Sequence, residues 1–392
     1  MRFLISTLNA SSHLRALAPV AAAARAGGHD VVVAGPPEAG AEVRLDYGLD
    51  FRPVGVDWAA DEDSAGTIGR HLALGAHRAY TDALKERAFF GDPAVRAAAD
   101  IRELAVEWNA DVVVRVAEEF GGYLAAEALG LPHVAVASGC THLLEAGAIS
   151  AELRRLRAAF GLSDQAHPDP YRYLLAGFTP PGYGDGTDAA TLRHYRQEQP
   201  ARVGEHAPAW LTELPTDRPL VYAAFGSVLT GQSWKLAPPA AALVRALGEV
   251  PCTAVVAAGD TAEQLRDAAP PSVRVVETVA QPLLLEAADL FVTHAGFGSV
   301  REALRAGTPM LALPVIGDEP FHAARCARLG VAKVVPVTAG PRALARACVE
   351  VLDTPSYRQA ARRVARTVLA LPGPDRLVAD VRDLVHRCRG VA

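Results

Sequence analysis

Apolar and polar residues alternate in blocks along the first half of the chain, and each block has the length of a strand or a helix. Short, Val-rich apolar runs predict strands at 2–8, 30–34, 111–115 and 133–137. Runs with helical spacing predict helices at 14–26 and 121–129, and a glycine follows each of them. Continuous apolar strands between helices indicate a parallel sheet that helices cover on both faces.

The second half of the chain follows the same architecture without repeating the sequence. Apolar runs predict strands at 220–225, 253–257, 273–278, 290–293, 310–314 and 333–337. The clearest intervening helices are predicted at 237–247, 320–329 and 342–352. We therefore predict an α/β protein with two Rossmann-like, doubly wound, parallel-sheet domains.

Prolines mark the passage from the first domain to the second. Pro200, Pro208, Pro215 and Pro219 interrupt a stretch of weak periodicity, which predicts a linker at 201–218 between domains at 1–200 and 219–372. A last helix is expected at 373–392, and whether it crosses back to the first domain stays open. Segments 57–70 and 161–188 are predicted to be loops that shape a pocket. Two such domains also predict a cleft between the carboxyl ends of their sheets.

Composition narrows the class of protein. A length of 392 residues is consistent with two domains, and a net charge of −5 without a Lys/Arg cluster argues against nucleic acid as the main partner. The five cysteines lack a CxxC spacing, so neither a zinc site nor a disulfide framework is predicted and a cytoplasmic location is expected. Asn9 and Ser11 interrupt the apolar start too early for a signal peptide, and no apolar stretch reaches 18 residues.

The most informative segment is Thr-His-Ala-Gly-Phe-Gly-Ser-Val-Arg-Glu at 293–302, between a predicted strand and a predicted helix start. Unpaired N–H groups and the helix dipole favour an anion at such a turn. Gly296 and Gly298 allow close approach of the backbone, and Ser299 and His294 can donate hydrogen bonds. Glu302 lies one turn into the helix, where it suits ribose hydroxyls. The segment predicts a nucleotide diphosphate site, and the alternative is a glycine-rich loop with a buried structural histidine.

A second candidate is His13, in the turn after the first strand. This turn lacks GxGxxG, so NAD or FAD is not expected there. Ser11 or Ser12 is predicted to cap the following helix, which places His13 in its first turn. The helix dipole keeps such an imidazole neutral, and a neutral imidazole can accept a proton from a hydroxyl nucleophile. A surface or structural role is the alternative.

Glu118 and Glu119 are candidate partners of this histidine. They follow the strand predicted at 111–115, at another turn near the expected switch in strand order. A carboxylate there could orient the imidazole and stabilise its protonated form. The alternative is an acidic pair that stabilises a helix N-terminus, and one residue could do both.

Taken together, the chain resembles bacterial natural-product glycosyltransferases of the GT-B, UDP-glycosyltransferase-like type, over nearly its whole length. The block at 294–302, continued by 307–309 and Gly-Asp-Glu-Pro at 317–320, is the most specific match. The segments 13–19, 125–133, 208–211 and 219–227 resemble the family's opening, its Ala-Ala-x-x-Leu-Gly-Ile-Pro segment, its linker and its second-domain entry. The resemblance implies inverting, metal-independent transfer of a deoxysugar from a dTDP- or UDP-sugar to an aglycone, without a further cofactor.

The resemblance also implies a role for each matched residue. His13 would be the general base, and Glu118 or Glu119 its support. The donor nucleotide would be bound by Ser227, Val279, Gln281, His294, Gly296, Phe297, Gly298, Ser299 and Glu302. Asp318 and Glu319 would contact the donor sugar, and Trp58, Phe89, Phe90, His142 and Tyr171 are candidates for the acceptor site, with plain packing as their alternative.

Three positions depart from the family pattern. Ser12 replaces a glycine before the histidine, Ala280 replaces a proline, and Glu319 replaces a glutamine. A carboxylate at position 319 accepts hydrogen bonds only, which would favour a different donor sugar. A sugar-nucleotide 2-epimerase, an envelope glycosyltransferase and a non-catalytic sugar-nucleotide binder remain as alternatives. The sequence leaves the identity of the acceptor open. It also leaves open whether the protein is a monomer or a homodimer.

Overall fold

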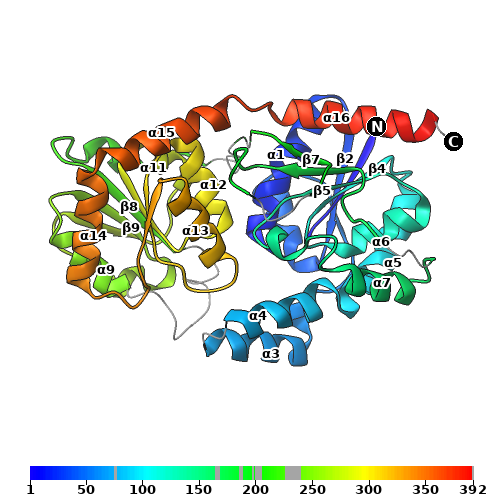
Figure 1. The fold of residues 1–392 in the computed structure, drawn as a ribbon, viewed down its shortest axis with the longest axis horizontal. Coiled ribbons are helices and arrows are strands. Elements are labelled where there is room, and N and C mark those ends of the chain that lie inside the picture. Colours follow the sequence, from blue (N-terminus) through cyan, green and yellow to red (C-terminus); the bar gives the residue numbers. More distant parts are fainter. Residues whose placement is uncertain are drawn as a thin grey trace. The chain divides into compact units, whose positions relative to one another are not determined.

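The computed structural model describes residues 1–74, 77–163, 168–184, 189–196, 198, 205–225 and 240–390 (Figure 1). The chain divides into two compact units. The first is formed by Met1–Leu72, Ala76–Val203 and Leu371–Ala392, and the second by Ala73–Gly75 and Gly204–Ala370. None of the described helices is both long and apolar enough to cross a membrane.

The first unit is built on a seven-stranded parallel sheet with the order β3-β2-β1-β4-β5-β6-β7. Its strands are β1 (Arg2–Ser6), β2 (Asp30–Gly35), β3 (Phe51–Pro53), β4 (Val112–Val116), β5 (His133–Val136), β6 (Leu174–Gly177) and β7 (Leu192–His194). Its helices are α1 (Ser11–Ala26), α2 (Gly40–Leu45), α3 (Glu62–Ala73), α4 (His77–Leu84), α5 (Asp92–Glu107), α6 (Phe120–Leu129), α7 (Ser150–Ala159) and α16 (Pro374–Gly390).

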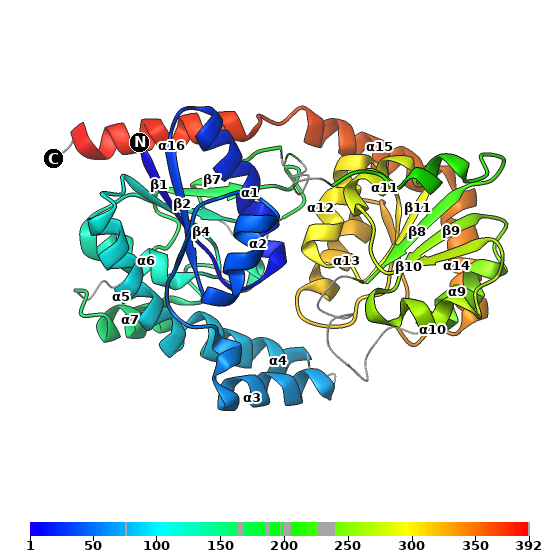
Figure 2. The ribbon, with the colours of Figure 1, turned by 180° about the vertical axis from the view of Figure 1, so that it is seen from behind.

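Alternation along the central strand explains how both faces of this sheet are buried. In β1, Phe3 and Ile5 pack on the side of α1 and α16, whereas Leu4 packs on the side of α5 and α6. Helix α16 runs beside α1 in both views (Figures 1 and 2). Its Asp380 accepts a hydrogen bond from the Tyr195 hydroxyl at 2.7 Å. The last helix of the chain thereby completes the core of the first unit.

The second unit is built on a six-stranded parallel sheet with the order β10-β9-β8-β11-β12-β13. Its strands are β8 (Leu220–Ala224), β9 (Thr253–Ala257), β10 (Val273–Val276), β11 (Leu290–Thr293), β12 (Met310–Ala312) and β13 (Ala332–Val334). Its helices are α9 (Ala240–Gly248), α10 (Ala262–Arg266), α11 (Gln281–Ala287), α12 (Phe297–Ala306), α13 (Glu319–Arg328), α14 (Pro341–Asp353) and α15 (Pro355–Leu369). The predicted fold class of two doubly wound parallel sheets is confirmed.

Two segments that were predicted to be loops contain regular structure. Most of segment 57–70 belongs to α3, whose Ile68 and Leu72 are buried. Gly66 and Gly69 disfavour a helix, so tertiary packing of this apolar face overrides local propensity. The segment 161–188 contains strand β6, which has only four residues and therefore gives too short an apolar run to stand out between prolines.

A cluster of charged side chains around a buried carboxylate joins α6, β5, α7 and the loop after α7. The Glu127 carboxylate, of which 5% is exposed, lies 2.8 Å from Arg157, 2.6 Å from Arg172 and 3.3 Å from His133. Burial alone raises the pKa of Glu127, but the hydrogen bonds from His133 and Arg157 and the charge of Arg172 outweigh it. The pKa of Glu127 is therefore lowered from 4.5 to about 2.

We expect this cluster to make stability depend on pH. Because the pKa of Glu127 is depressed in the folded state, its stabilising contribution is present above pH 4.5 and is lost as pH falls towards 2. The pKa shift corresponds to roughly 3 kcal/mol. Glu127→Gln should lower the urea midpoint at pH 7 far more than at pH 3, whereas exposed Glu103→Gln should not. An equal loss for Glu127→Gln at both pH values would contradict this account.

Candidate functional site

Each sheet changes its strand order once, and these two points position the candidate residues. In the first unit β1 lies between β2 and β4, and in the second β8 lies between β9 and β11. In doubly wound sheets, ligands bind beyond the carboxyl ends of the strands at such a point. The turn after β1 carries His13, and the turn after β11 carries His294. Both candidates from the sequence therefore lie at the switch point of their own unit.

The turn between β11 and α12 has the geometry of an anion site. Ala295 adopts a left-handed conformation with φ of 67°, and its N–H donates to the Thr293 hydroxyl at 3.1 Å. Gly296 then caps α12, and the first helical hydrogen bond is donated by Val300 to the Gly296 carbonyl at 3.0 Å. The preceding N–H groups, those of residues 297–299, lie at the positive end of the helix.

His294 lies under this turn and is 9% exposed. Burial lowers its pKa to about 4, although the Asp318 carboxylate and the Ala224 backbone act in the opposite direction. The ring is therefore neutral at pH 7. Its Nδ1 is buried without a hydrogen-bond partner among the described residues. A Cβ atom at Gly296 would lie 2.3 Å from Nε2 of His294, so the close approach requires glycine.

Three predicted nucleotide-binding residues meet beside the turn. Gln281, the first residue of α11, donates from Nε2 to Glu302 Oε2 at 2.6 Å and to Ser299 Oγ at 3.2 Å. Ser299 and Glu302 follow on successive turns of α12, and both are buried. The structure brings these three side chains together from two helices.

The other residues predicted for the donor occupy different surroundings. Val279 is partly buried between β10 and α11. Phe297 is buried, stacks on His322 at 4.7 Å and lies under the Arg301 guanidinium. Gly298 has open space around the position of a Cβ atom. Ser227 lies outside the described residues.

Asp318 and Glu319, predicted to contact the donor sugar, differ in environment. Asp318 is partly exposed and lies 3.2 Å from Nε2 of His322. Glu319 is buried, and its Oε2 accepts hydrogen bonds from the N–H groups of Val315 and Ile316 at 2.6 and 2.9 Å. Burial, with the Asp318 charge, raises the pKa of Glu319 to about 8 despite these bonds. Glu319 thus holds the loop before α13, a contact that the sequence analysis missed.

In the first unit, His13 lies in the first turn of α1, as predicted. The predicted serine cap is wrong. Ala10 occupies the N-cap position without a side-chain hydrogen bond, and Ser11 Oγ donates instead to Glu42 at 2.6 Å. The physical reason is that Ser11 is already helical, so its hydroxyl bonds to α2 rather than to its own helix.

Glu118 and Glu119 are both buried in the turn after β4. Glu119 caps α6 by accepting from the Gly122 N–H, and it accepts from Ser6 Oγ at 2.5 Å. Glu118 accepts from the Ser138 hydroxyl and from the Cys140 N–H. The helix-terminal alternative is therefore confirmed for Glu119. A fully buried Arg115 donates to three carbonyls at the end of β4 and in this turn, and to the Pro170 carbonyl, which fixes the backbone that carries both carboxylates.

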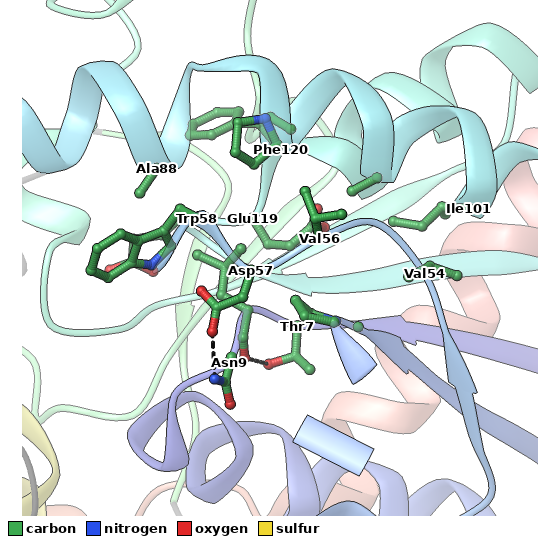
Figure 3. A pocket seen from close by; sticks show the side chains of 17 residues that line it. Thr7, Asn9, Val54, Val56, Asp57, Trp58, Ala88, Ile101, Glu119 and Phe120 are labelled. Carbon is green, nitrogen blue, oxygen red and sulfur yellow. Dashed lines mark hydrogen bonds between the residues drawn. The ribbon is translucent and has the colours of Figure 1, made fainter. Parts of the chain in front are cut away.

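A small cavity of about 20 Å³ opens beside these carboxylates (Figure 3). Trp58, Phe120 and Val56 supply apolar walls, and Glu118 and Glu119 line it as well. The sequence analysis missed Asp57, which accepts a hydrogen bond from Asn9 Nδ2 at 2.6 Å across the cavity edge. Nothing in the sequence indicates this contact, because Asp57 is an acidic residue in a segment that was predicted to be a loop.

The other residues predicted for the acceptor belong mainly to the core. Phe89 and Phe90 are buried, and Phe90 packs against Phe120 with ring centroids 4.5 Å apart. Tyr171 is fully buried, and its hydroxyl donates to the Leu144 carbonyl at 2.9 Å. For these three the packing alternative is what the structure shows. His142 is partly buried and contacts the Gly139 carbonyl through Nδ1.

Comparison with known proteins agrees with this geometry. Residues 241–384 match the model of the erythromycin biosynthesis protein CIII-like, C-terminal domain. The TDP-daunosamine transferase DnrS of Streptomyces peucetius is 27% identical over 100% of this chain and 99% of its own length. Tylactone mycaminosyltransferase of Streptomyces fradiae is 28% identical over 99% of this chain and 93% of its own.

Solved structures share the fold of this chain. The glycosyltransferase VinC in complex with dTDP superimposes with a TM-score of 0.73 and 25% identity over 99% of this chain and 100% of its own. The spinosyn rhamnosyltransferase SpnG, complexed with thymidine diphosphate, has the same fold with a TM-score of 0.79, 22% identity, and 97% and 100% coverage.

The fold and the relatives define the class: the chain is a nucleotide-sugar-dependent glycosyltransferase with the GT-B fold. Within that class, the predicted resemblance to bacterial glycosyltransferases of antibiotic biosynthesis is confirmed. Its residues 241–384 match the model of the erythromycin biosynthesis protein CIII-like, C-terminal domain, and its named relatives include a TDP-daunosamine transferase and a tylactone mycaminosyltransferase. Sugar transfer to an aglycone is the activity that these relatives support.

Proposed function

We propose that this protein transfers a deoxysugar from a dTDP- or UDP-sugar to a natural-product aglycone, with inversion at the anomeric carbon and without a metal. The observation that carries the proposal is the turn at 293–299, where a neutral buried histidine and helix-terminal N–H groups lie at a switch point. This arrangement suits the two phosphates of a leaving nucleoside diphosphate. The nucleotides named for VinC and SpnG support the same reading.

In the second unit, each group would have a distinct task. His294 and the N–H groups of α12 would donate to the diphosphate and stabilise the charge that develops as the bond to the sugar breaks. Glu302 would accept from the ribose, and the backbone at 279–281 would meet the base. The fixed N–H dipoles would stabilise the negative charge of the leaving diphosphate, as a bound cation would otherwise do. The proposed transfer therefore needs no metal.

In the first unit, His13 would act as the general base. Its imidazole would take the proton of an acceptor hydroxyl while the hydroxyl oxygen attacks the anomeric carbon. The bond from that carbon to the phosphate oxygen breaks, and the nucleoside diphosphate leaves. A single displacement of this kind inverts the anomeric carbon and needs only one base. Glu118 or Glu119 would support the imidazolium while it holds its own turn.

A bulky, partly apolar acceptor would contact the residues beside Trp58 from outside, because the cavity there, of about 20 Å³, has room for about one water molecule. Val56, Trp58 and Phe120 offer contact area, and Asp57 offers a hydrogen-bond acceptor at the edge. A 2-epimerase or an envelope transferase would share the donor site. A non-catalytic binder would need the nucleotide site without His13.

The test is a transfer assay with the wild-type chain. A panel of dTDP- and UDP-sugars is incubated with an aglycone library in the presence of EDTA, and products are detected by mass spectrometry. We expect a new species that has the mass of the aglycone plus the sugar minus water, formed at the same rate with and without EDTA. Nucleotide binding without any glycoside would favour the binder, and loss of transfer in EDTA would overturn metal independence.

A further inference from the structure

A hydrogen bond between two side chains joins the loops that border the small cavity of the first unit. Asn9, in the turn between β1 and α1, donates from Nδ2 to Asp57 Oδ2 at 2.6 Å (Figure 3). Asp57 belongs to the loop between β3 and α3 and is only 7% exposed. Its other oxygen, Oδ1, accepts from the Ala59 N–H at 3.0 Å. Because a buried carboxylate depends on such donors, loss of the Asn9 amide would disturb the position of Asp57.

On one side of this bond lies the turn that leads to His13. The N-cap residue of α1 is Ala10, which has no polar side chain to cap the helix. The Ala10 carbonyl accepts from the His13 N–H at 2.9 Å, and the Ala10 N–H donates to the Leu8 carbonyl at 2.9 Å. Asn9 lies between Leu8 and Ala10 in the chain. Its bond to Asp57 therefore anchors the turn from which the first turn of α1 starts.

On the other side lies the loop that supplies part of the apolar cavity wall. This loop is held a second time where the Gly55 N–H donates to Asp100 of α5 at 2.7 Å. Val56 follows directly and is 40% exposed. Trp58, next to Asp57, packs against buried residues of the first unit. The segment 55–58 therefore offers apolar surface at a fixed position relative to the turn that leads to α1.

We propose that Asn9 and Asp57 are positioning residues that set the spacing between the general base and the apolar surface that contacts the acceptor. The inference rests on the proposed role of His13. An acceptor that packs against Val56 and Trp58 would bring its hydroxyl to the imidazole only while the loop and the turn keep this spacing. Proton transfer requires hydrogen-bond distance, and a misplacement of about 1 Å costs up to about a hundredfold in rate.

An exchange of the two side chains tests this role. In Asn9→Asp two carboxylates face each other and repel, and Asn9→Ala, a milder variant in case the first does not fold, only removes the donor. The double variant Asn9→Asp with Asp57→Asn restores the bond with its direction reversed. The amide introduced at position 57 would donate to the carboxylate introduced at position 9, and its oxygen would still accept from Ala59. Asp50→Asn, at an exposed position of the same unit, is the control.

We measure kcat and KM with the donor and the aglycone that give product in the transfer assay. Calorimetry with dTDP and UDP gives nucleotide affinity, and thermal unfolding gives stability. We expect Asn9→Asp to lower kcat about tenfold to a hundredfold and Asn9→Ala to lower it less. The double variant should recover most of the lost kcat, and Asp50→Asn should behave as the wild type does. Nucleotide affinity should stay unchanged in all variants, because the proposed donor site belongs to the second unit.

Several outcomes would overturn the inference. If the double variant recovers no activity, the Asp57 carboxylate acts by itself and not through its bond to Asn9. A higher KM for the aglycone at unchanged kcat would place Asp57 in contact with the acceptor. A lower melting temperature at unchanged kcat would show a role in stability alone. In each of these cases the proposed function stands, whereas a wild type that transfers sugar to none of the aglycones would overturn the proposed function and this inference with it.

Discussion

His13→Ala is expected to lower the rate of sugar transfer by about 10²–10⁴-fold while leaving nucleotide affinity unchanged. The reason is that the imidazole would accept the acceptor's proton in the transition state, whereas the groups proposed to bind the nucleotide belong to the second unit. Transfer is measured as kcat and KM for the acceptor, and nucleotide affinity is measured by calorimetry with the same preparation.

The matched control is His386→Ala, an exposed histidine on α16 of the same unit. It should leave both measurements unchanged. Raising the pH does not replace a missing base attached to the protein, so the His13 variant should regain little rate at high pH. If His13→Ala turns over at the wild-type rate, the general base must be sought elsewhere, and Glu118 and Glu119 would be the next residues to substitute.

The second large effect is expected at His294. His294→Ala should weaken nucleoside diphosphate binding by about tenfold to a hundredfold, because hydrogen bonds to charged groups contribute roughly 1.5–3 kcal/mol. Gly296→Ala should have a similar effect, because the added Cβ atom would lie 2.3 Å from Nε2 of His294 and would displace the ring. Calorimetric titration with dTDP and UDP gives the affinities.

Two variants sharpen the interpretation at this position. His294→Gln retains an N–H donor and should recover part of the lost affinity, and exposed His206→Ala in the same unit should bind as the wild type does. Undiminished affinity in His294→Ala would count against the whole assignment of the second unit to the donor. A loss that His294→Gln does not reduce would point to packing rather than to donation.

The fold and the two histidines at the switch points could be predicted from the sequence, because the patterns that indicate them lie in consecutive residues. Strand β11 and the block from His294 to Glu302 lie in consecutive residues, so apolar pattern, glycine spacing and helix start can be read together. Likewise, Val-rich runs such as β4 need no information from distant segments. The strand predictions at 253–257 and 290–293 coincide with β9 and β11 for the same reason.

What the sequence missed depends on contacts that only the folded chain makes, within one loop for Glu319 and between distant segments for the other residues. Glu319 reads as a sugar-binding residue, and only the folded loop shows it holding two N–H groups. Phe89 and Phe90 were predicted for the acceptor site, but they are buried because α5 and α6 pack around them. The meeting of Gln281 with Glu302 joins positions 21 residues apart. Hydrophobic pattern says which face of an element is buried but not which side chain lies opposite it.

The central claim is that one base and one leaving nucleotide suffice for a direct displacement at the anomeric carbon. The measurement that tests it most directly is the anomeric configuration of the glycoside obtained in the transfer assay, determined by NMR from proton couplings and one-bond carbon–proton couplings. A product whose configuration is opposite to that of the donor sugar is the predicted result. Retention of the donor configuration would contradict the account, because it would require a second displacement or a different mechanism.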